Sequence, residues 1–307
     1  MAVTHPSISI VICTYNRDRF IRAALESLIK QELNKAFYEV LVIDNRSTDQ
    51  TARIVQEVIA QNPDTVIRYF YEENKGLSHA RNRGYREAGS GIITYIDDDA
   101  EATPEFAASL LQFFEHHPEA VGAGGKVLPK YPDGEEPVWM SHYLYGFVAG
   151  QDHGDQLRKY DRQMKYPAGC NMSYRKAALE KAGGFNTDLQ FRSDDKAINF
   201  RVRQFSQDIW YVPAAVVYHN IDAERLQPEN FRKLYLKTGN EEKIRVRAEK
   251  GGWGLFTKGL EFVFKWKVSW LIGLKFLLAG TPAKGRYLIK SQWYTLKGFF
   301  MKNVFVR

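Results

Sequence analysis

Three consecutive carboxylates, Asp97, Asp98 and Asp99, follow a short run of strand character. Residues 92–96 are isoleucine, threonine and tyrosine, which favour a buried strand. Neighbouring carboxylates repel one another unless a cation lies among them. Hard divalent ions such as Mg²⁺ and Mn²⁺ prefer oxygen ligands and commonly bridge to phosphate. The stretch therefore predicts a divalent-metal and phosphate site at the carboxyl end of a strand, where open α/β sheets bind ligands.

The alternative is that the three acids cap the helix that follows them. Thr103 is the better N-cap candidate, because Pro104 and Glu105 come directly after it and suit a first helical turn. We therefore expect the acids to bind a metal rather than to cap.

Composition and charge narrow the class of protein. A chain of 307 residues with 44% hydrophobic and 26% charged residues is long enough for one large globular domain with an appendage. Residues 251–307 contain ten Lys/Arg and one acid, Glu261, a net charge of +9. The other 250 residues contain 33 basic and 35 acidic residues, a net charge of −2. We expect no nucleic-acid partner for the main domain.

The cysteines and the N-terminus bear on location. Cys13 and Cys170 form neither a disulfide framework nor a metal-ligand pattern, which fits a reducing compartment. Residues 1–6 lack the basic and apolar regions of a signal peptide. The sequence therefore predicts a cytoplasmic protein.

The first hundred residues alternate strand and helix patterns, which predicts an α/β fold with a mostly parallel, doubly wound central sheet and helices on both faces. Neither GxGxxG after the first strand nor GxxxxGK[ST] is present, so dehydrogenase and P-loop interpretations lose their main support. The predicted strands are 7–13, 38–43, 66–71 and 92–96, and the predicted helices lie near 21–29, 54–59 and 77–88.

The second half has a more mixed pattern. Residues 129–166, rich in Pro, Gly, Asp and aromatics, read as a long surface region of functional or mobile character. We expect helices over 105–116, 176–182 and 194–204, with Gly183 and Gly184 ending the second, and strands over 120–128 and 209–218.

Four motifs together resemble the family 2 glycosyltransferases of the GT-A fold, over roughly residues 7–220. The resemblance implies transfer of a sugar from a nucleotide-sugar, with inversion at the anomeric carbon, using a divalent metal such as Mn²⁺ or Mg²⁺. The motifs are Cys13-Thr14-Tyr15-Asn16-Arg17, residues 42–49 around Asp44, Asn74-Lys75-Gly76 with residues 80–84, and residues 95–99.

The resemblance also assigns roles to single residues. Asp97 matches a ribose-contacting acid, Asp99 a metal ligand and His219 a further metal ligand. Arg81 would meet the diphosphate near a helix N-terminus. The residues implied to bind the nucleotide-sugar are Thr14, Tyr15, Arg17, Asp44, Gly76, Arg81, Asp97 and Asp98.

Three of these assignments have structural alternatives. Asp44 would otherwise form an Asx-type turn or a salt bridge with Arg46. Arg81 would otherwise lie on a solvated helix face. A lone histidine such as His219 is often structural.

Asp195 matches the family's catalytic base within Ser193-Asp194-Asp195. Inverting transfer needs one base to deprotonate the acceptor hydroxyl. The alternative is that Ser193 caps a helix and the two acids favour its N-terminus, and both roles are compatible. Where many members carry a further acid, this chain has Ala197.

The basic tail carries four of the six tryptophans, Trp253, Trp266, Trp270 and Trp293. Lys265, Lys267 and Lys275 interrupt its apolar stretch, so it does not resemble a spanning helix. Aromatic and aliphatic residues with lysines suit an interfacial helix on an anionic membrane. The alternative is an extension packed on protein, and the sequence leaves oligomer formation open.

The sequence thus predicts a catalytic domain at 1–225, with a nucleotide-binding half to about 100 and an acceptor-binding half after it, and a helical extension at 226–307. The predicted function is metal-dependent inverting transfer from a UDP-sugar to a glycan or lipid-linked acceptor in surface polysaccharide or glycoconjugate synthesis, at the inner face of the cell membrane. The rivals are a sugar nucleotidyltransferase and a non-catalytic glycan-binding or scaffold protein.

Overall fold

The computed structural model describes residues 6–161, 164, 166–188 and 194–301. Packing divides them into two compact units. The sheet unit comprises the described residues of 6–129, 149–188 and 194–220, and the helical unit comprises 130–148 and 221–301.

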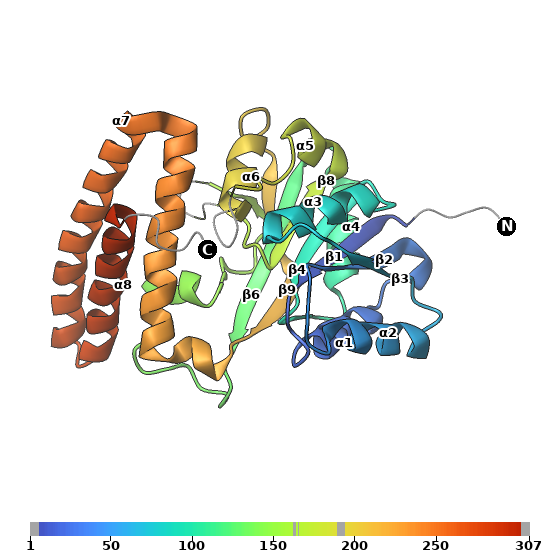
Figure 1. The fold of residues 1–307 in the computed structure, drawn as a ribbon, viewed down its shortest axis with the longest axis horizontal. Coiled ribbons are helices and arrows are strands. Elements are labelled where there is room, and N and C mark those ends of the chain that lie inside the picture. Colours follow the sequence, from blue (N-terminus) through green and yellow to red (C-terminus); the bar gives the residue numbers. More distant parts are fainter. Residues whose placement is uncertain (1–5, 162–163, 165, 189–193, 302–307) are drawn as a thin grey trace. The chain divides into compact units, whose positions relative to one another are not determined.

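Four parallel strands form one half of the sheet, in the order β3-β2-β1-β4. Their carboxyl ends share one edge, since Thr14 pairs with Asp44 and Cys13 pairs with Asp97. The predicted α/β fold and its mostly parallel sheet are confirmed (Figure 1). These strands are β1 (Ile8–Thr14), β2 (Tyr38–Asp44), β3 (Ile67–Tyr71) and β4 (Ile92–Asp97).

Antiparallel strands extend the sheet beyond β4. β8 pairs with β4 and with β6, and β9 pairs with β5 and β7. Gly125 has no room for a side chain, because a Cβ there would lie 1.8 Å from the carbonyl oxygen of Ala215. The strands are β5 (Ala100–Ala102), β6 (Gly122–Lys130), β7 (Arg158–Lys159), β8 (Asn171–Arg175) and β9 (Ile209–Asn220).

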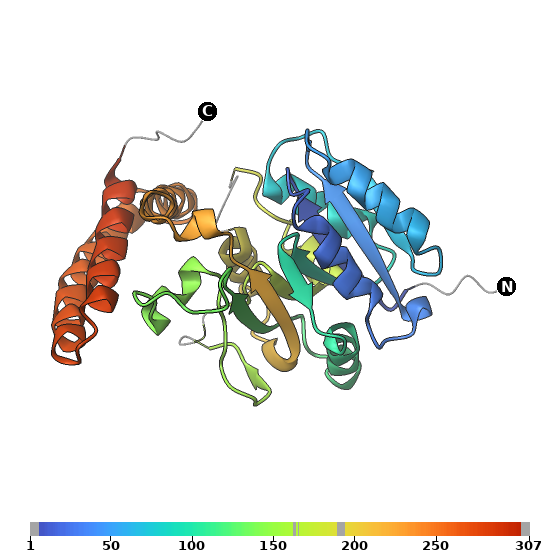
Figure 2. The same ribbon diagram turned by 90° about the horizontal axis from the view of Figure 1, so that it is seen from below.

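Helices cover both faces of the sheet. Ile8, Ile10 and Ile12 of β1 point into a core with α1, α2 and α4, whereas Val11 joins a second core with α3, α5 and α6. Figures 1 and 2 show α1 and α2 side by side. The helices are α1 (Ile21–Ile29), α2 (Thr51–Gln61), α3 (Leu77–Glu87), α4 (Phe106–His116), α5 (Lys176–Lys181) and α6 (Asp194–Val202), with the short 3-10 turn η1 (Lys35–Phe37) before β2.

Two expectations about the second half are wrong. Thr103 does not cap a helix through its side chain, because α4 begins at Phe106 and the Thr103 hydroxyl is buried with no hydrogen-bond partner among the described residues. Residues 129–166 are not surface throughout. Met140, Leu144 and Phe147 are buried in the core of the helical unit, where aromatic and aliphatic side chains of later helices enclose them.

The helical unit is built from two long helices, α7 (Pro228–Leu278) and α8 (Pro282–Phe300), with the 3-10 turns η2 (His142–Phe147) and η3 (Ala223–Leu226). Gly251, with φ 61° and ψ −155°, interrupts α7. We call residues 228–250 its first arm and 252–278 its second arm; Figure 1 shows the turn between them in orange. Among the described residues, no helix is long and apolar enough to cross a bilayer.

Candidate active site

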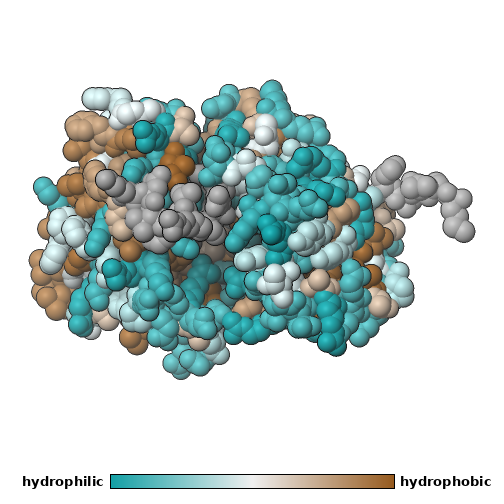
Figure 3. Space-filling model, viewed as in Figure 1, coloured by the Kyte–Doolittle hydropathy of each residue, from teal (hydrophilic) through white to brown (hydrophobic). Residues whose placement is uncertain are grey.

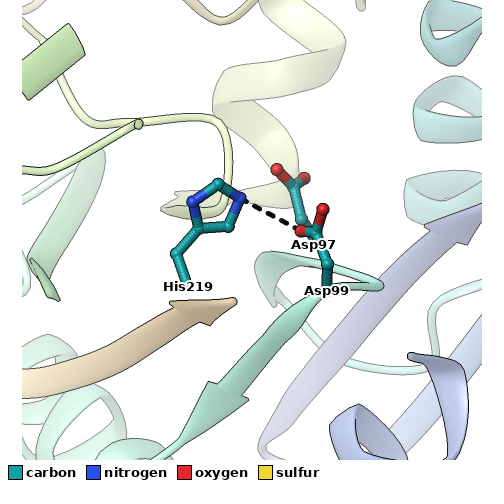
Figure 4. A group of neighbouring side chains, drawn as sticks. All are labelled: Asp97, Asp99 and His219. Atoms are coloured by element: carbon teal, nitrogen blue, oxygen red, sulfur yellow. Dashed lines mark ion pairs between the residues drawn. The ribbon is translucent and has the colours of Figure 1, made fainter. Parts of the chain in front are cut away.

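A group of three potential metal ligands lies where β4 and β9 end. One ligand atom each from Asp97, Asp99 and His219 lies within 4.8 Å of the other two. His219 Nε2 is 3.1 Å from Asp99 Oδ1, and Figure 4 shows the imidazole pointing toward the carboxylates. Two carboxylates and an imidazole suit Mn²⁺ well, and Mg²⁺ with more oxygen ligands. The donor set therefore fits the divalent metal expected from the sequence.

The pairing of β5 with β9 brings His219 to the acids. Ala100, directly after the acids, pairs with His219 across this ladder. The next residue, Asn220, donates its backbone N–H to the Asp99 carbonyl oxygen at 2.8 Å and its side-chain amide to the same oxygen at 3.2 Å. Backbone pairing thus fixes the histidine against acids that lie 120 positions earlier in the chain.

Asp98 lies beside the metal-ligand group and is buried. Burial, followed by the neighbouring Asp99 charge, raises the pKa of Asp98 to about 8. Arg17 opposes this shift, because its Nε is 3.5 Å from Asp98 and its Nη2 is 3.6 Å from Asp99. Burial also raises the pKa of Asp97. The site concentrates negative charge that a cation would stabilise.

Arg81 is buried among the acids, with 3% of its surface exposed. Its guanidinium is 2.5 Å from Asp194, 3.6 Å from Asp97 and 3.2 Å from the Gly169 carbonyl oxygen. Burial alone would lower the pKa of Arg81, but the carboxylates of Asp194 and Asp97 more than offset it and the pKa is raised. The alternative of a solvated helix face is therefore wrong.

Asp195 lies in the first turn of α6 and directly follows Asp194, which forms an ion pair with Arg81. It is partly buried, and its Oδ1 accepts the Lys196 backbone N–H at 2.6 Å. Two acids in a first helical turn also agree with the electrostatic interpretation. Its role as base stays a prediction, and Ser193, the expected cap, lies outside the described residues.

Asp44 is buried, with both carboxylate oxygens engaged. Oδ1 accepts the Ser47 backbone N–H at 2.7 Å and Oδ2 accepts the Tyr69 hydroxyl at 2.7 Å. The first bond closes a local turn to the residue three positions on, one position further than the Asx turn named as the alternative. Contact with a nucleotide stays a prediction.

Asn45 organises the loop predicted to contact the nucleotide. Its side-chain oxygen accepts the Gly76 backbone N–H at 2.6 Å, and its amide donates to the Asn74 carbonyl oxygen at 2.6 Å. Gly76 has φ 135°, a conformation that side chains rarely adopt. Lys75 lies over the exposed ring of Tyr15 at 5.3 Å, so the ends of β1 and of this loop meet.

The first two strand-to-helix loops are also joined to each other. Asn16 accepts the Thr48 backbone N–H at 2.8 Å and donates its own to Ser47 Oγ at 3.0 Å. The Arg17 backbone N–H donates to Thr51 Oγ1 at 2.9 Å. Thr14 is buried at the end of β1. The predicted nucleotide-binding residues of β1 and β2 therefore belong to one hydrogen-bonded assembly.

Sequence reasoning missed two organising residues. Asp194 was interpreted only as part of a helix N-terminus, and its partner Arg81 is 113 residues away, so no local pattern marks the pair. Asn45 carried a weak signal, since it is a polar residue directly after a strand-ending acid.

The sequence of this chain is similar to those of known proteins. The family model described as glycosyl transferase family 2 matches residues 9–183. A glucosyl-dolichyl phosphate glucuronosyltransferase of Haloferax volcanii is 26% identical over 190 residues, covering 61% of this chain and 58% of that protein. The putative glycosyltransferase EpsH of Bacillus subtilis is 23% identical over 243 residues, covering 75% and 65%. The chain therefore spans less than two thirds of either relative.

Solved structures agree on the fold. The mannosyltransferase PcManGT of Pyrobaculum calidifontis, solved with GDP-Man and Mn²⁺, aligns with a TM-score of 0.63 and 17% identity over 95% of this chain and 87% of that one. Residues 1–349 of S. aureus TarS, solved with UDP-GlcNAc, align with a TM-score of 0.59 and 16% identity over 95% and 89%. With the family model matching more than half of its residues, the chain belongs to glycosyl transferase family 2.

Proposed function

We propose that this chain is a metal-dependent inverting glycosyltransferase that moves a sugar from a UDP-sugar to an acceptor hydroxyl. The observation that carries the proposal is the grouping of Asp97, Asp99 and His219, with ligand atoms within 4.8 Å of one another. Membership of the family and the shared carboxyl edge of β1, β2 and β4 support it.

Asp99, His219 and Asp97 would hold the divalent metal. When bound, the metal supplies positive charge that stabilises the departing nucleoside diphosphate. Asp98 and Arg17 lie beside this position, and Arg17 adds a cation whose distances to Asp98 and Asp99 are 3.5 and 3.6 Å. On metal binding we expect Arg17 to turn from these acids toward the diphosphate, because the two cations would otherwise compete for the same oxygens.

The nucleoside would lie along the loops after β1 and β2. Tyr15 offers an exposed aromatic ring, and Gly76 lies where a side chain would strain the backbone. Asp44 has each oxygen in one hydrogen bond, and each carboxylate oxygen can accept a second, so contact with the base or ribose is compatible with both bonds.

Asp195 would deprotonate the acceptor hydroxyl as its oxygen attacks the anomeric carbon. Arg81 holds the preceding residue, Asp194, and also lies 3.6 Å from Asp97. One guanidinium therefore links the metal-binding strand end to the helix that carries the base. Since Arg81 is buried and occupied, we assign it a positioning role rather than direct contact with the diphosphate.

The acceptor we propose is a glycan or a lipid-linked sugar in surface polysaccharide or glycoconjugate synthesis. Among the relatives, one is named for a dolichyl phosphate substrate and another for an undecaprenol-linked substrate. A lipid-linked acceptor requires access to a membrane. We propose a peripheral location on the cytoplasmic leaflet, with residues 251–307 and their net charge of +9 as the attachment.

A screen of nucleotide-sugars with and without Mn²⁺ tests the proposal. The full chain should bind one UDP-sugar more tightly with Mn²⁺ and should slowly hydrolyse it to UDP and free sugar without an acceptor. Release of pyrophosphate from a sugar phosphate and UTP would instead identify a nucleotidyltransferase. Binding of glycans with no nucleotide-sugar binding would identify a non-catalytic protein, and either result would refute the proposal.

A further inference from the structure

The second arm of α7 exposes an apolar ridge along one side. Each step between its members is three, four or seven residues, so they share one helix face. Leu271 is 71% and Leu278 is 81% exposed, which soluble proteins avoid for large aliphatic side chains in a row. The ridge runs over 22 residue-to-residue steps, from residue 256 to residue 278, or about 33 Å at about 1.5 Å per residue. We define the apolar ridge as Phe256, Leu260, Phe264, Leu271, Leu274 and Leu278.

The opposite face of the same arm is already packed. Gly273 faces Gly285 of α8, where a Cβ on Gly285 would lie 2.9 Å from the Gly273 Cα. Phe262 packs edge-on against Phe299 at 5.2 Å. The arm is therefore apolar on two sides, and among the described residues of the helical unit only one of these sides has a packing partner. Figure 3 shows brown, hydrophobic residues at the surface of this unit.

Helix α8 adds basic residues beside the ridge. Its exposed positions Arg286, Lys290, Trp293 and Lys297 also follow steps of three and four. The Trp293 ring lies 5.2 Å from Trp266 of the second arm, and Trp266 lies 6.5 Å from Trp270. This line of three indoles connects the basic face of α8 to the apolar side of α7.

We propose that the apolar ridge lies in the headgroup region of an anionic membrane, with the basic face of α8 against the lipid phosphates. This inference rests on the proposed membrane attachment and identifies the surface and the lipid chemistry that would serve it. Lys267 falls on the ridge between Phe264 and Leu271, and it is exposed. Its long side chain can reach back to the phosphates, which keeps the helix at the interface.

A second copy of this chain fits the same surface poorly. Glu261 is the only acid between residues 251 and 301, and it already binds Lys258 at 2.8 Å and Lys265 at 2.5 Å. Pairing the ridge with itself would bring Lys267 of each copy to the same interface with no acid to oppose it. Anionic headgroups provide the missing countercharge, so charge complementarity favours lipid.

Vesicle flotation of the full chain, without metal or nucleotide-sugar, tests the inference. The probe is phosphatidylcholine vesicles with and without phosphatidylglycerol. The double variant Phe264→Gln/Leu271→Gln removes apolar area without changing charge. Val66→Gln/Val138→Gln is its matched control, because both valines are at least half exposed and lie off the ridge. Lys290→Gln/Lys297→Gln tests the basic face.

The ridge variant should lower the partition coefficient on phosphatidylglycerol vesicles about tenfold or more. The lysine variant should lower it by roughly tenfold or more on the same vesicles, and the valine control should match the wild type. Circular dichroism and melting temperatures check that each variant folds.

Equal partition of the ridge variant and the wild type would refute the inference. The inference would also be refuted if light scattering shows that the wild type is a dimer and the ridge variant a monomer, and if the wild type does not bind the vesicles. Nucleotide-sugar binding is measured in solution without lipid. A negative flotation result would therefore refute the membrane inference and leave the proposed transfer reaction to its own test.

Discussion

The Arg81 guanidinium and the Asp194 carboxylate form a buried ion pair at 2.5 Å, although 113 residues separate them. The pair joins α3 to α6, and Asp97 at 3.6 Å extends it to the end of β4. Because Asp195 follows Asp194 directly, the position of the proposed base depends on this arginine.

Asp194→Ala should be strongly destabilising. The substitution leaves the Arg81 charge buried, with the Asp97 carboxylate 3.6 Å away as its remaining ion-pair partner. Removing one partner of a buried ion pair costs about 3–5 kcal/mol. Urea denaturation should show this fall in the free energy of unfolding. Asp188→Ala, at an exposed acid, is the control and should stay within about 0.5 kcal/mol of the wild type. Similar losses in both variants would contradict a structural role for the pair.

Asp195→Asn should retain nucleotide-sugar binding and lose transfer. The amide keeps the shape of the side chain but cannot accept the acceptor proton, so kcat should fall by at least about a hundredfold. Calorimetry measures binding and release of UDP measures turnover, with Asp188→Asn as the control. Normal turnover in Asp195→Asn would remove this residue from the role of base.

Asp99→Ala and His219→Ala should both weaken Mn²⁺ binding. Removing Asp99 should abolish metal-dependent turnover, and removing His219 should lower Mn²⁺ affinity by at least roughly tenfold. Isothermal titration with Mn²⁺ measures the affinity. His142→Ala is the matched control, because His142 is exposed in η2. Unchanged affinity in His219→Ala would show that the histidine is only structural.

The metal-free protein should become less stable as pH rises between about 4 and 8. Asp98 has a folded pKa of about 8, raised from 3.8, so the folded state binds more protons than the unfolded state in this window. Its contribution to stability is full below pH 3.8 and is lost as pH rises through the folded pKa. Melting temperatures across this range measure the slope, which Asp98→Asn should flatten and Mn²⁺ should oppose. A slope that is equal in wild type and Asp98→Asn would exclude this carboxyl as its source.

Gly76→Ala should lower the free energy of unfolding, whereas Gly91→Ala should leave it nearly unchanged. Gly76 has φ 135°, and a side chain there strains the backbone by about 1–3 kcal/mol. The Cβ of Gly91→Ala would meet no atom of the described residues within 4 Å. Thermal unfolding should give a lower melting temperature for Gly76→Ala than for Gly91→Ala. If the loop bound by Asn45 contacts the nucleotide, UDP-sugar affinity should fall only in Gly76→Ala. Equal affinities would exclude that contact.

Periodic apolar patterns and strand-ending polar residues were enough to predict much of the sheet unit. The strands ending at Thr14, Asp44 and Asp97 are confirmed within a residue or two, because their side chains are buried on both faces and their sequences are apolar nearly throughout. Cap chemistry was less informative. Thr103 met every local rule for a cap, yet it directly follows β5, and α4 begins only at Phe106.

The sequence by itself determined which side chains can bind a cation and a diphosphate, because those capacities reside in residue type and in short spacing along a strand end. Only the tertiary structure decided which of them meet. The pairing of β5 with β9 places His219 beside Asp99. Arg81, which the sequence allowed to lie on an exposed helix face, is buried and forms an ion pair with Asp194. The outer side of α7 is likewise a tertiary result, since an apolar helix has a free face only once its neighbours have covered the other.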